Sequence, residues 1–251
     1  MGGAFHPVFS SVSRLPHNEC LNCGFDSWRL PADLSSHESK NLNDFIEHRR
    51  PIRRSQYLYR AGAPLESLYA VNSGFLRTSV SDSHGREQII GFSMTGELVG
   101  LDAIGAGSYL CDSIALEDSS VCGIHFSDFE KLGLIIPALQ QHLHRAMSTE
   151  ITRDHGIMLL LGAMSAEERV IIFLLNISKR FSTRGFSGTY FRLPMTRRDI
   201  GSYLGLKLET VSRVFSHLNN IHLISINHKS IEIKSIPKLQ QRIGSHETLR
   251  S

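Results

Sequence analysis

The chain has 251 residues, of which 41% are hydrophobic, and a formal net charge of +3. This length suits one or two modest domains, and no apolar run approaches the roughly 18 residues that a membrane-spanning helix needs. The first residues lack the pattern of a secretory signal, and four cysteines are too few for a disulfide framework. These features argue against a membrane protein and a disulfide-rich secreted scaffold, and they predict a cytoplasmic protein.

Charge is distributed unevenly along the chain. Residues 166–251 carry 14 Lys and Arg against 6 Asp and Glu, whereas residues 1–165 carry 13 against 18. A basic C-terminal third behind an acidic front is typical of a protein whose one end meets a polyanion. Composition alone does not separate this reading from a merely basic surface.

The sequence pattern in the N-terminal half changes after about residue 35. Residues 1–35 are rich in Ser, Pro, His and Asn and lack periodicity, so we expect a loop or short helix that carries Cys20 and Cys23. Short apolar runs such as SLYAVNSGFLRTSV follow, separated by Gly, Asp and Ser at intervals of roughly 8–12 residues. This spacing predicts an antiparallel sandwich or barrel, which we assign to a sensor domain over residues 36–138.

A long helix is predicted over residues 139–165, where the hydrophobic period changes. Its apolar stripe consists of Leu139, Leu143, Met147, Ile151, Met158 and Leu161. Such a helix between two domains predicts a coiled-coil dimer seam. Asp154 interrupts the stripe, and two such carboxylates facing each other in a parallel dimer are costly. Either Asp154 turns to the rim, or it keeps the dimer weak so that a signal must favour dimerisation.

Residues 166–251 predict a winged helix-turn-helix domain. The helical pattern EERVIIFLLNISKRF leads to a Gly-Phe-Ser-Gly turn, two short helices and the apolar hairpin LISINHKSIEIKS. In the first short helix, Thr196 is the expected cap with Asp199 in the capping-box position, and Gly205 permits the tight turn. The expected inner faces are Ile200, Tyr203 and Leu204 in the first helix and Leu208, Val211, Val214 and Phe215 in the second.

Three residues are left pointing outward on the leading turns of the second helix, which in this motif enter the major groove. Arg213 can pair bidentately with a guanine edge, Glu209 can accept from a cytosine amino group, and Ser212 is short enough for close approach. Thr196 and Arg197, where the first helix begins, complete the expected DNA contacts. Lys229 in the hairpin is an expected phosphate contact.

The segments RDIGSYLGLKLETVSRVFSHL and AEERVIIFLLNISKRFSTRGFS resemble the oxygen-responsive FNR branch of the CRP/FNR transcription regulators, and the likeness continues through GELVGLDAIG, ALEDSSVC and MLLLGAMSAEER. The resemblance implies an α+β chain with a cyclic-nucleotide-binding-type β-roll, a long dimerisation helix and a C-terminal winged helix-turn-helix. It places Glu209, Ser212 and Arg213 on base-reading positions, and it implies a homodimer on palindromic double-stranded DNA with TTGAT half-sites.

The resemblance also implies contacts with RNA polymerase through surface loops. Phe186, Ser187, Asp118 and the 81–88 loop lie on the matching stretches.

Cyclic-nucleotide sensing is disfavoured by the sequence. Nucleotide binders in this family resemble the chain at Glu97, which would hold the ribose, but they also need an arginine for the cyclic phosphate. The aligned position holds Tyr109, and no Arg or Lys lies between Glu97 and Lys131. A buried phosphate without a cation is poorly held.

The FNR branch instead implies a [4Fe-4S] cluster on four thiolates. Cys20 and Cys23 match its C-x2-C, and Cys122 matches its distant ligand, but Arg29 stands where a third N-terminal cysteine is expected. Asp26 is the favoured fourth ligand from the same loop. A lone C-x2-C also suits zinc or a disulfide switch, so a direct thiol switch and another signal remain open.

Cys111 is the other candidate for the missing thiolate. If the turn of ALEDSSVC centres on Asp118–Ser119, Cys122 faces Ala115 and Cys111 lies roughly 13 Å further along the strand. That distance is too long for one compact cluster, so we expect Cys111 to be a buried small hydrophobe.

The expected mechanism is a shift from monomer to dimer. Cluster binding would order the N-terminal segment against the dimer helix and offset the repulsion at Asp154. Two function classes compete with a regulator: a redox enzyme that uses Cys20 and Cys23, and a signal-binding module without DNA activity. Loop-like flanks and the lack of a nucleotide-binding glycine pattern disfavour the enzyme, and the base-reading residues disfavour the module.

Overall fold

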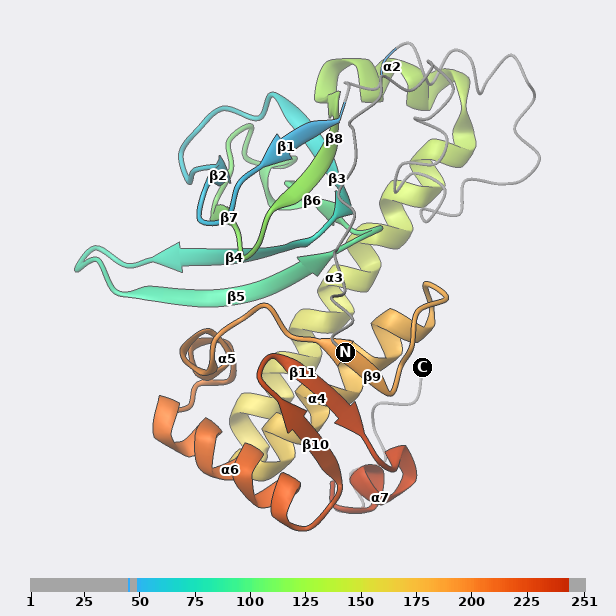
Figure 1. Cartoon of the computed structure of the whole chain (residues 1–251). Coiled ribbons are helices and arrows are strands. Elements are labelled where there is room, and N and C mark those ends of the chain that lie inside the picture. Colours follow the sequence, from blue (N-terminus) through green and yellow to red (C-terminus); the bar gives the residue numbers. More distant parts are fainter. Residues whose placement is uncertain (1–44, 46–48, 244–251) are drawn as a thin grey trace, which may run out of the picture.

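A computed structural model of the chain describes residue 45 and residues 49–243, and it contains three sheets (Figure 1). Two four-stranded antiparallel sheets form the N-terminal domain. The first has the order β1 (Arg50–Ile52), β8 (Ser119–His125), β3 (Ser67–Ser73) and β6 (Leu98–Val99). The second has the order β2 (Tyr57–Tyr59), β7 (Asp112–Ala115), β4 (Phe75–Ser81) and β5 (Glu87–Met94). The predicted antiparallel sandwich is confirmed.

The expected hairpin between the strands that end at Ala115 and begin at Ser119 is wrong. β7 pairs with β4 and β2, whereas β8 pairs with β3 and β1, so that Cys122 lies opposite Ala70 rather than Ala115. Consecutive buried residues in both strands are the physical reason. Such strands are covered on both faces, and the chain crosses from one sheet to the other instead of folding back.

Two helices follow the sheets. α2 (Phe126–Ile135) packs its buried Phe129 and Leu132 against the first sheet, and α3 (Pro137–Ala163) then runs from α2 to the C-terminal domain (Figure 1). Leu139, expected on the dimer seam, is fully buried with Phe129 and Leu132, and Leu143 is half-buried against the same cluster. The first turns of α3 therefore complete the core of the sensor domain.

The C-terminal domain contains four helices and a three-stranded sheet. The helices are α4 (Ala166–Ser182), α5 (Arg197–Leu204), α6 (Leu208–Asn220) and α7 (Ile236–Gln241). The sheet has the order β10 (Ile224–Asn227), β11 (Ser230–Ile233) and β9 (Tyr190–Arg192). The three expected helices and the hairpin are present, while β9 and α7 were not anticipated. Ser165 caps α4 in a capping box with Glu168, which starts the helix sharply after α3.

One hydrophobic core joins the two domains. Phe92 and Met94 on β5 belong to the same buried cluster as Phe173 on α4 and Tyr203 on α5. The helix-turn-helix therefore packs in part against β5 of the second sheet. Among the described residues, no helix is both long and apolar enough to cross a membrane.

Candidate nucleic-acid interface

The first helix of the motif begins at a capping box. Thr196 Oγ1 accepts from the backbone N–H of Asp199 at 3.1 Å, and the Asp199 carboxylate accepts from the backbone N–H of Thr196 at 2.7 Å. Two backbone donors that would otherwise lack partners are thus satisfied. The helix ends at Leu204 and is capped by Gly205, which has φ +63°. A side chain there would be strained, so the sharp turn into α6 depends on this glycine.

The second helix presents two distinct faces. Val211, Phe215 and Leu218 are buried, whereas Glu209 and Arg213 are exposed and Ser212 is half-exposed. Positions three and four apart lie on one side of a helix, so these last three residues share a face directed away from the core. Arg213 Nη2 lies 3.4 Å from Thr210 Oγ1, a long contact that leaves its other guanidinium donors available.

The packing of α6 differs from the sequence prediction at one position. Leu208 was expected to anchor α6, but it is 40% exposed at the first position of the helix. Leu206, in the turn before α6, is instead partly buried against the core. The tight turn draws Leu206 inward because its N–H bonds to the carbonyl of Gly201 at 2.8 Å.

Arg197 lies with its guanidinium carbon 3.4 Å from the centroid of the Phe215 ring, where cation–π attraction holds it. Burial lowers the pKa of Arg197 to about 10, which still leaves it charged at neutral pH. The side chain is therefore fixed at the start of α5, close to the recognition helix. A phosphate oxygen there would gain a preorganised cation.

The basic residues around α6 are arranged differently from the expectation. Lys229 is half-buried, and its ammonium donates to the carbonyl of Pro194 at 3.0 Å, which ties the wing to the segment before α5. Lys207 and Arg198 are exposed beside the starts of α6 and α5. The sequence-based list of expected DNA contacts includes neither residue, although each is a cation beside a predicted helix of the motif.

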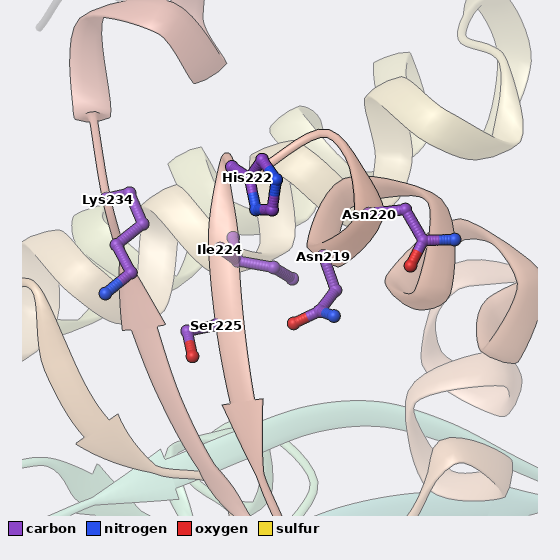
Figure 2. A pocket seen from close by; sticks show the side chains of 6 residues that line it. All are labelled: Asn219, Asn220, His222, Ile224, Ser225 and Lys234. Atoms are coloured by element: carbon purple, nitrogen blue, oxygen red, sulfur yellow. The ribbon is translucent and has the colours of Figure 1, made fainter.

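A polar pocket of about 420 Å³ lies at the other end of α6 (Figure 2). Its lining consists of Asn219, Asn220, His222, Ile224, Ser225 and Lys234. Asn219 lies ten residues, roughly 15 Å along the helix axis, from Glu209. The pocket is therefore separate from the outward face that carries Glu209, Ser212 and Arg213.

The sensor sheet contacts the helix-turn-helix directly. Ser202 Oγ on α5 accepts from the backbone N–H of Ile89 on β5 at 2.9 Å, and the Gln88 side chain donates to the Ser202 carbonyl. Nearby, the rings of Phe92 and Tyr203 meet edge to face with centroids 5.1 Å apart. Hydrogen bonds and aromatic packing thus join β5 to α5.

A buried ionic cluster forms a second connection between the domains. Glu97, in the turn between β5 and β6, accepts from Arg180 Nε at 2.9 Å and from Arg184 Nη2 at 2.8 Å, and Arg153 on α3 lies 3.6 Å away. Burial alone would raise the pKa of the Glu97 carboxyl, but the charges of Arg180, Arg153 and Arg184 lower it to about 2. Arginines from α3, from α4 and from the turn after α4 therefore surround one carboxylate.

The buried cluster between the two sheets includes stacked tyrosines. The rings of Tyr59 and Tyr109 stack with centroids 3.9 Å apart, and Tyr109 donates its hydroxyl to the carbonyl of Ser67 at 2.6 Å. Tyr109 is 3% exposed. Glu97, which the sequence comparison set against a ribose-binding position, accepts hydrogen bonds from Arg180 and Arg184.

The two described cysteines lie in different clusters. Cys122 is fully buried with Leu68, Ile124 and Phe129, between the first sheet and α2. Cys111 belongs to a separate cluster to which both sheets contribute, and its thiol donates to the Asp102 carboxylate at 3.1 Å, while burial raises its pKa. Among the described residues, no group of three or more His, Cys, Asp and Glu is placed to hold a metal ion. Cys20, Cys23 and Asp26 lie outside the described residues.

The described surroundings of the two cysteines differ. The buried neighbours of Cys122 in its cluster are apolar side chains. The Cys111 thiol is already a donor to a carboxylate, which favours its protonated form. Cys111 is therefore a buried residue with a local partner, close to the small hydrophobe that the sequence predicts.

The residues expected on other surfaces are placed as follows. On α3, Ile151 and Met158 are 53% and 68% exposed, Asp154 is exposed, and Met147 is half-buried. In the surface loops, Phe186, Ser187 and Asp118 are exposed, as is the hairpin tip over residues 81–88. Phe186 also lines a cavity of about 260 Å³ with Glu117, the neighbour of Asp118.

Comparisons with known proteins cover most of the chain. The cyclic nucleotide-binding domain family matches residues 49–133, and the Crp-like helix-turn-helix domain family matches residues 168–242. The fumarate and nitrate reduction regulatory protein of Escherichia coli (strain K12) is 42% identical over 90% of this chain and 90% of its own length. The anaerobic regulatory protein of Pasteurella multocida (strain Pm70) is 42% identical over 91% of this chain and 84% of its own length. The structure of FixK2 from Bradyrhizobium japonicum matches with a TM-score of 0.71 and 32% identity, covering 77% of this chain and 95% of that one.

Proposed function

Because the chain belongs to the FNR branch of the CRP/FNR family of transcription regulators, we propose that it acts in the cytoplasm as an oxygen- or redox-responsive regulator that binds a palindromic operator. The relatives named above are regulators rather than enzymes. Their names, which refer to anaerobic regulation and to fumarate and nitrate reduction, support a signal linked to oxygen.

The outward face of α6 is the observation that carries the proposal. Glu209, Ser212 and Arg213 stand on its leading turns without a partner that removes them from solvent. We assign base reading to these three residues, with Arg213 on a guanine of a TTGAT half-site. Thr196 and Arg197 contact phosphate at the start of α5, together with Lys207 and Arg198.

We propose that the active form is a homodimer whose seam is α3. Ile151 and Met158 are large apolar side chains exposed on this helix, and a second α3 would cover them together with Met147 and Leu143. Asp154 lies among them, and its charge opposes the approach of an identical helix. The proposal keeps the domain boundaries expected from the sequence: 1–35, 36–138, 139–165 and 166–251.

We propose that the signal enters through Cys20, Cys23 and Cys122, which would hold an iron–sulfur cluster of the [4Fe-4S] type with Asp26 as the fourth ligand. When bound, the cluster would supply an oxygen-sensitive cross-link between the N-terminal segment and β8. Cys122 contributes a buried thiol against α2, and α2 leads directly into α3. Ordering at β8 would therefore bias the dimer helix.

A thiol switch between Cys20 and Cys23 without iron is the second candidate, because a C-x2-C supports it and Arg29 replaces the third expected thiolate. Dithiothreitol alone would then control DNA binding. For output, we propose that RNA polymerase contacts Phe186, Ser187, Asp118 and the 81–88 hairpin, all of which are exposed.

Fluorescence anisotropy with the full chain tests the proposal. Labelled DNA with a TTGAT palindrome is compared with a scrambled palindrome, both without oxygen and in air. Preferential binding of the palindrome that weakens in air is the expected result. Equal affinity for the two DNAs would contradict the assignment of a sequence-specific regulator, and equal binding in air and without oxygen would contradict the sensor.

A further inference from the structure

Arg169 joins the ends of two helices. It lies half-buried on the first turn of α4, and three of its nitrogens donate to three backbone carbonyls. Nη2 bonds to the carbonyl of Leu161 at 2.8 Å and Nε to that of Met164 at 3.0 Å, both where α3 ends. Nη1 bonds to the carbonyl of Leu204 at 3.1 Å, the last residue of α5.

These contacts suit an arginine for two physical reasons. The last carbonyls of a helix lack intrahelical partners and carry the negative end of its dipole, so a cation there is favourable. A guanidinium also presents its donors in a rigid planar fork, whereas a lysine ammonium is a compact charge on a flexible stem. The side chain of Arg169 therefore fixes the end of α3 relative to the end of α5.

The two helix ends also touch without a gap. A Cβ atom added at Gly205 would lie 3.1 Å from Leu161 Cδ2 and 3.6 Å from Arg169 Nη1. The glycine that makes the turn thus also permits the close approach of α3. The recognition helix begins at Leu208, four residues after Leu204, so the direction of α6 relative to α3 is set at this junction.

We infer that Arg169 is a positioning residue for DNA reading, which couples the orientation of α6 to the dimer helix and so fixes the spacing of half-sites that the dimer accepts. The inference rests on the proposed function. Two half-sites lie about one DNA turn, roughly 34 Å, apart. A rigid junction holds the two recognition helices at one distance, so that the dimer binds half-sites with one spacing. A loose junction would let the dimer bind neighbouring spacings as well.

Spacing selectivity is the readout that tests this role. The full chain is assayed without oxygen on two palindromes: one with the preferred spacer, and one with a single inserted base pair, which moves a half-site by roughly 3.4 Å and rotates it by roughly 35°. The affinity for the preferred spacer is divided by the affinity for the lengthened spacer. This ratio is compared for the wild-type chain, Arg169→Gln and Arg169→Lys. Lys179→Gln, which removes an exposed cation from the same helix, is the control, and thermal melting is recorded for every protein.

We expect Arg169→Gln to lower the ratio by about tenfold, Arg169→Lys to fall between it and the wild type, and Lys179→Gln to keep the wild-type ratio. A purely structural role would lower the melting temperature and leave the ratio unchanged, which would overturn the inference. Failure of both Arg169 variants to fold would overturn it as well. If only Arg169→Gln fails to fold, a wild-type ratio in Arg169→Lys would overturn the inference. A wild-type chain that binds neither palindrome would instead contradict the proposed function.

Discussion

Glu97 and Arg180 join the sensor domain to the DNA-binding domain through a hydrogen bond of 2.9 Å between Oε1 and Nε. Arg180 also donates to the carbonyl of Phe92 at 2.6 Å. Arg180 therefore connects α4 both to β5 and to the turn that follows it. This buried pair thus connects the two domains.

Replacing Glu97 by Gln should destabilise the chain. The substitution leaves Arg180 and Arg184 without this counter-charge and leaves Arg153 with Glu150 at 2.8 Å. Breaking a buried ion pair costs about 3–5 kcal/mol. Urea unfolding at pH 7 measures this loss, with Glu232→Gln, an exposed carboxylate paired with Lys234, as the control. Equal losses in the two variants would show that the cluster contributes little.

The same carboxylate predicts a pH dependence. The pKa of Glu97 is lowered from 4.5 to about 2 in the folded chain, so its stabilisation is present above pH 4.5 and is lost as the pH falls towards 2. The contribution is on the order of 3 kcal/mol. The unfolding free energy of the wild-type chain should therefore fall more steeply over this interval than that of Glu97→Gln. Equal slopes of the unfolding free energy against pH in the two proteins would contradict the lowered pKa of Glu97.

Base reading is tested at Arg213. Arg213→Ala should lose about 1–3 kcal/mol of specific binding and relax the preference at one guanine, because the bidentate contact disappears. Competition with operators altered one base pair at a time measures this change. Unchanged selectivity in the variant would mean that α6 enters the groove with another face.

Phosphate contact is tested at Lys207, because Lys229 is engaged with the Pro194 carbonyl. Lys207→Gln should weaken binding to all sequences alike and reduce the slope of log affinity against log salt by about 0.9. Lys131→Gln, on α2 of the sensor domain, removes the same charge and should leave the slope unchanged. A wild-type slope in Lys207→Gln would remove this residue from the interface.

Dimerisation is tested at Asp154. If this carboxylate opposes the approach of a second α3, Asp154→Ala should dimerise and bind the operator in air, whatever the state of the cysteines. Sedimentation of the wild-type chain, Asp154→Ala and the control Glu130→Ala, an exposed carboxylate on α2, measures the shift. A wild-type chain that is already a tight dimer in air would contradict the idea.

The cluster is tested by anaerobic reconstitution, which should give about four iron and four sulfide per chain with broad visible absorption. Cys20→Ser, Cys23→Ser and Cys122→Ser should each abolish the absorption, and Asp26→Ala should weaken it, since a carboxylate oxygen is a poor ligand for iron–sulfur chemistry. Cys111→Ser is the matched control for a buried cysteine and should leave the cluster intact. A chain that binds no iron, or a Cys111 as necessary as Cys122, would show that the ligand assignment is wrong.

Local signals in the sequence were sufficient for the helix-turn-helix. The capping box of Thr196 and Asp199, the glycine turn at Gly205 and the buried Val211 and Phe215 each depend on residues within a few positions of one another. Helix caps and amphipathic periodicity act over such short distances. The sequence alone therefore determined the motif and its outward face.

The tertiary structure decided everything that depends on distant partners. Glu97 meets Arg180 across 83 residues, and Arg169 reaches the Leu204 carbonyl across 35. The crossing between β7 and β8 and the burial of Leu139 likewise follow from which sheets and helices pack together. Periodicity shows that a residue is buried but not what covers it, because the covering side chain comes from elsewhere in the chain.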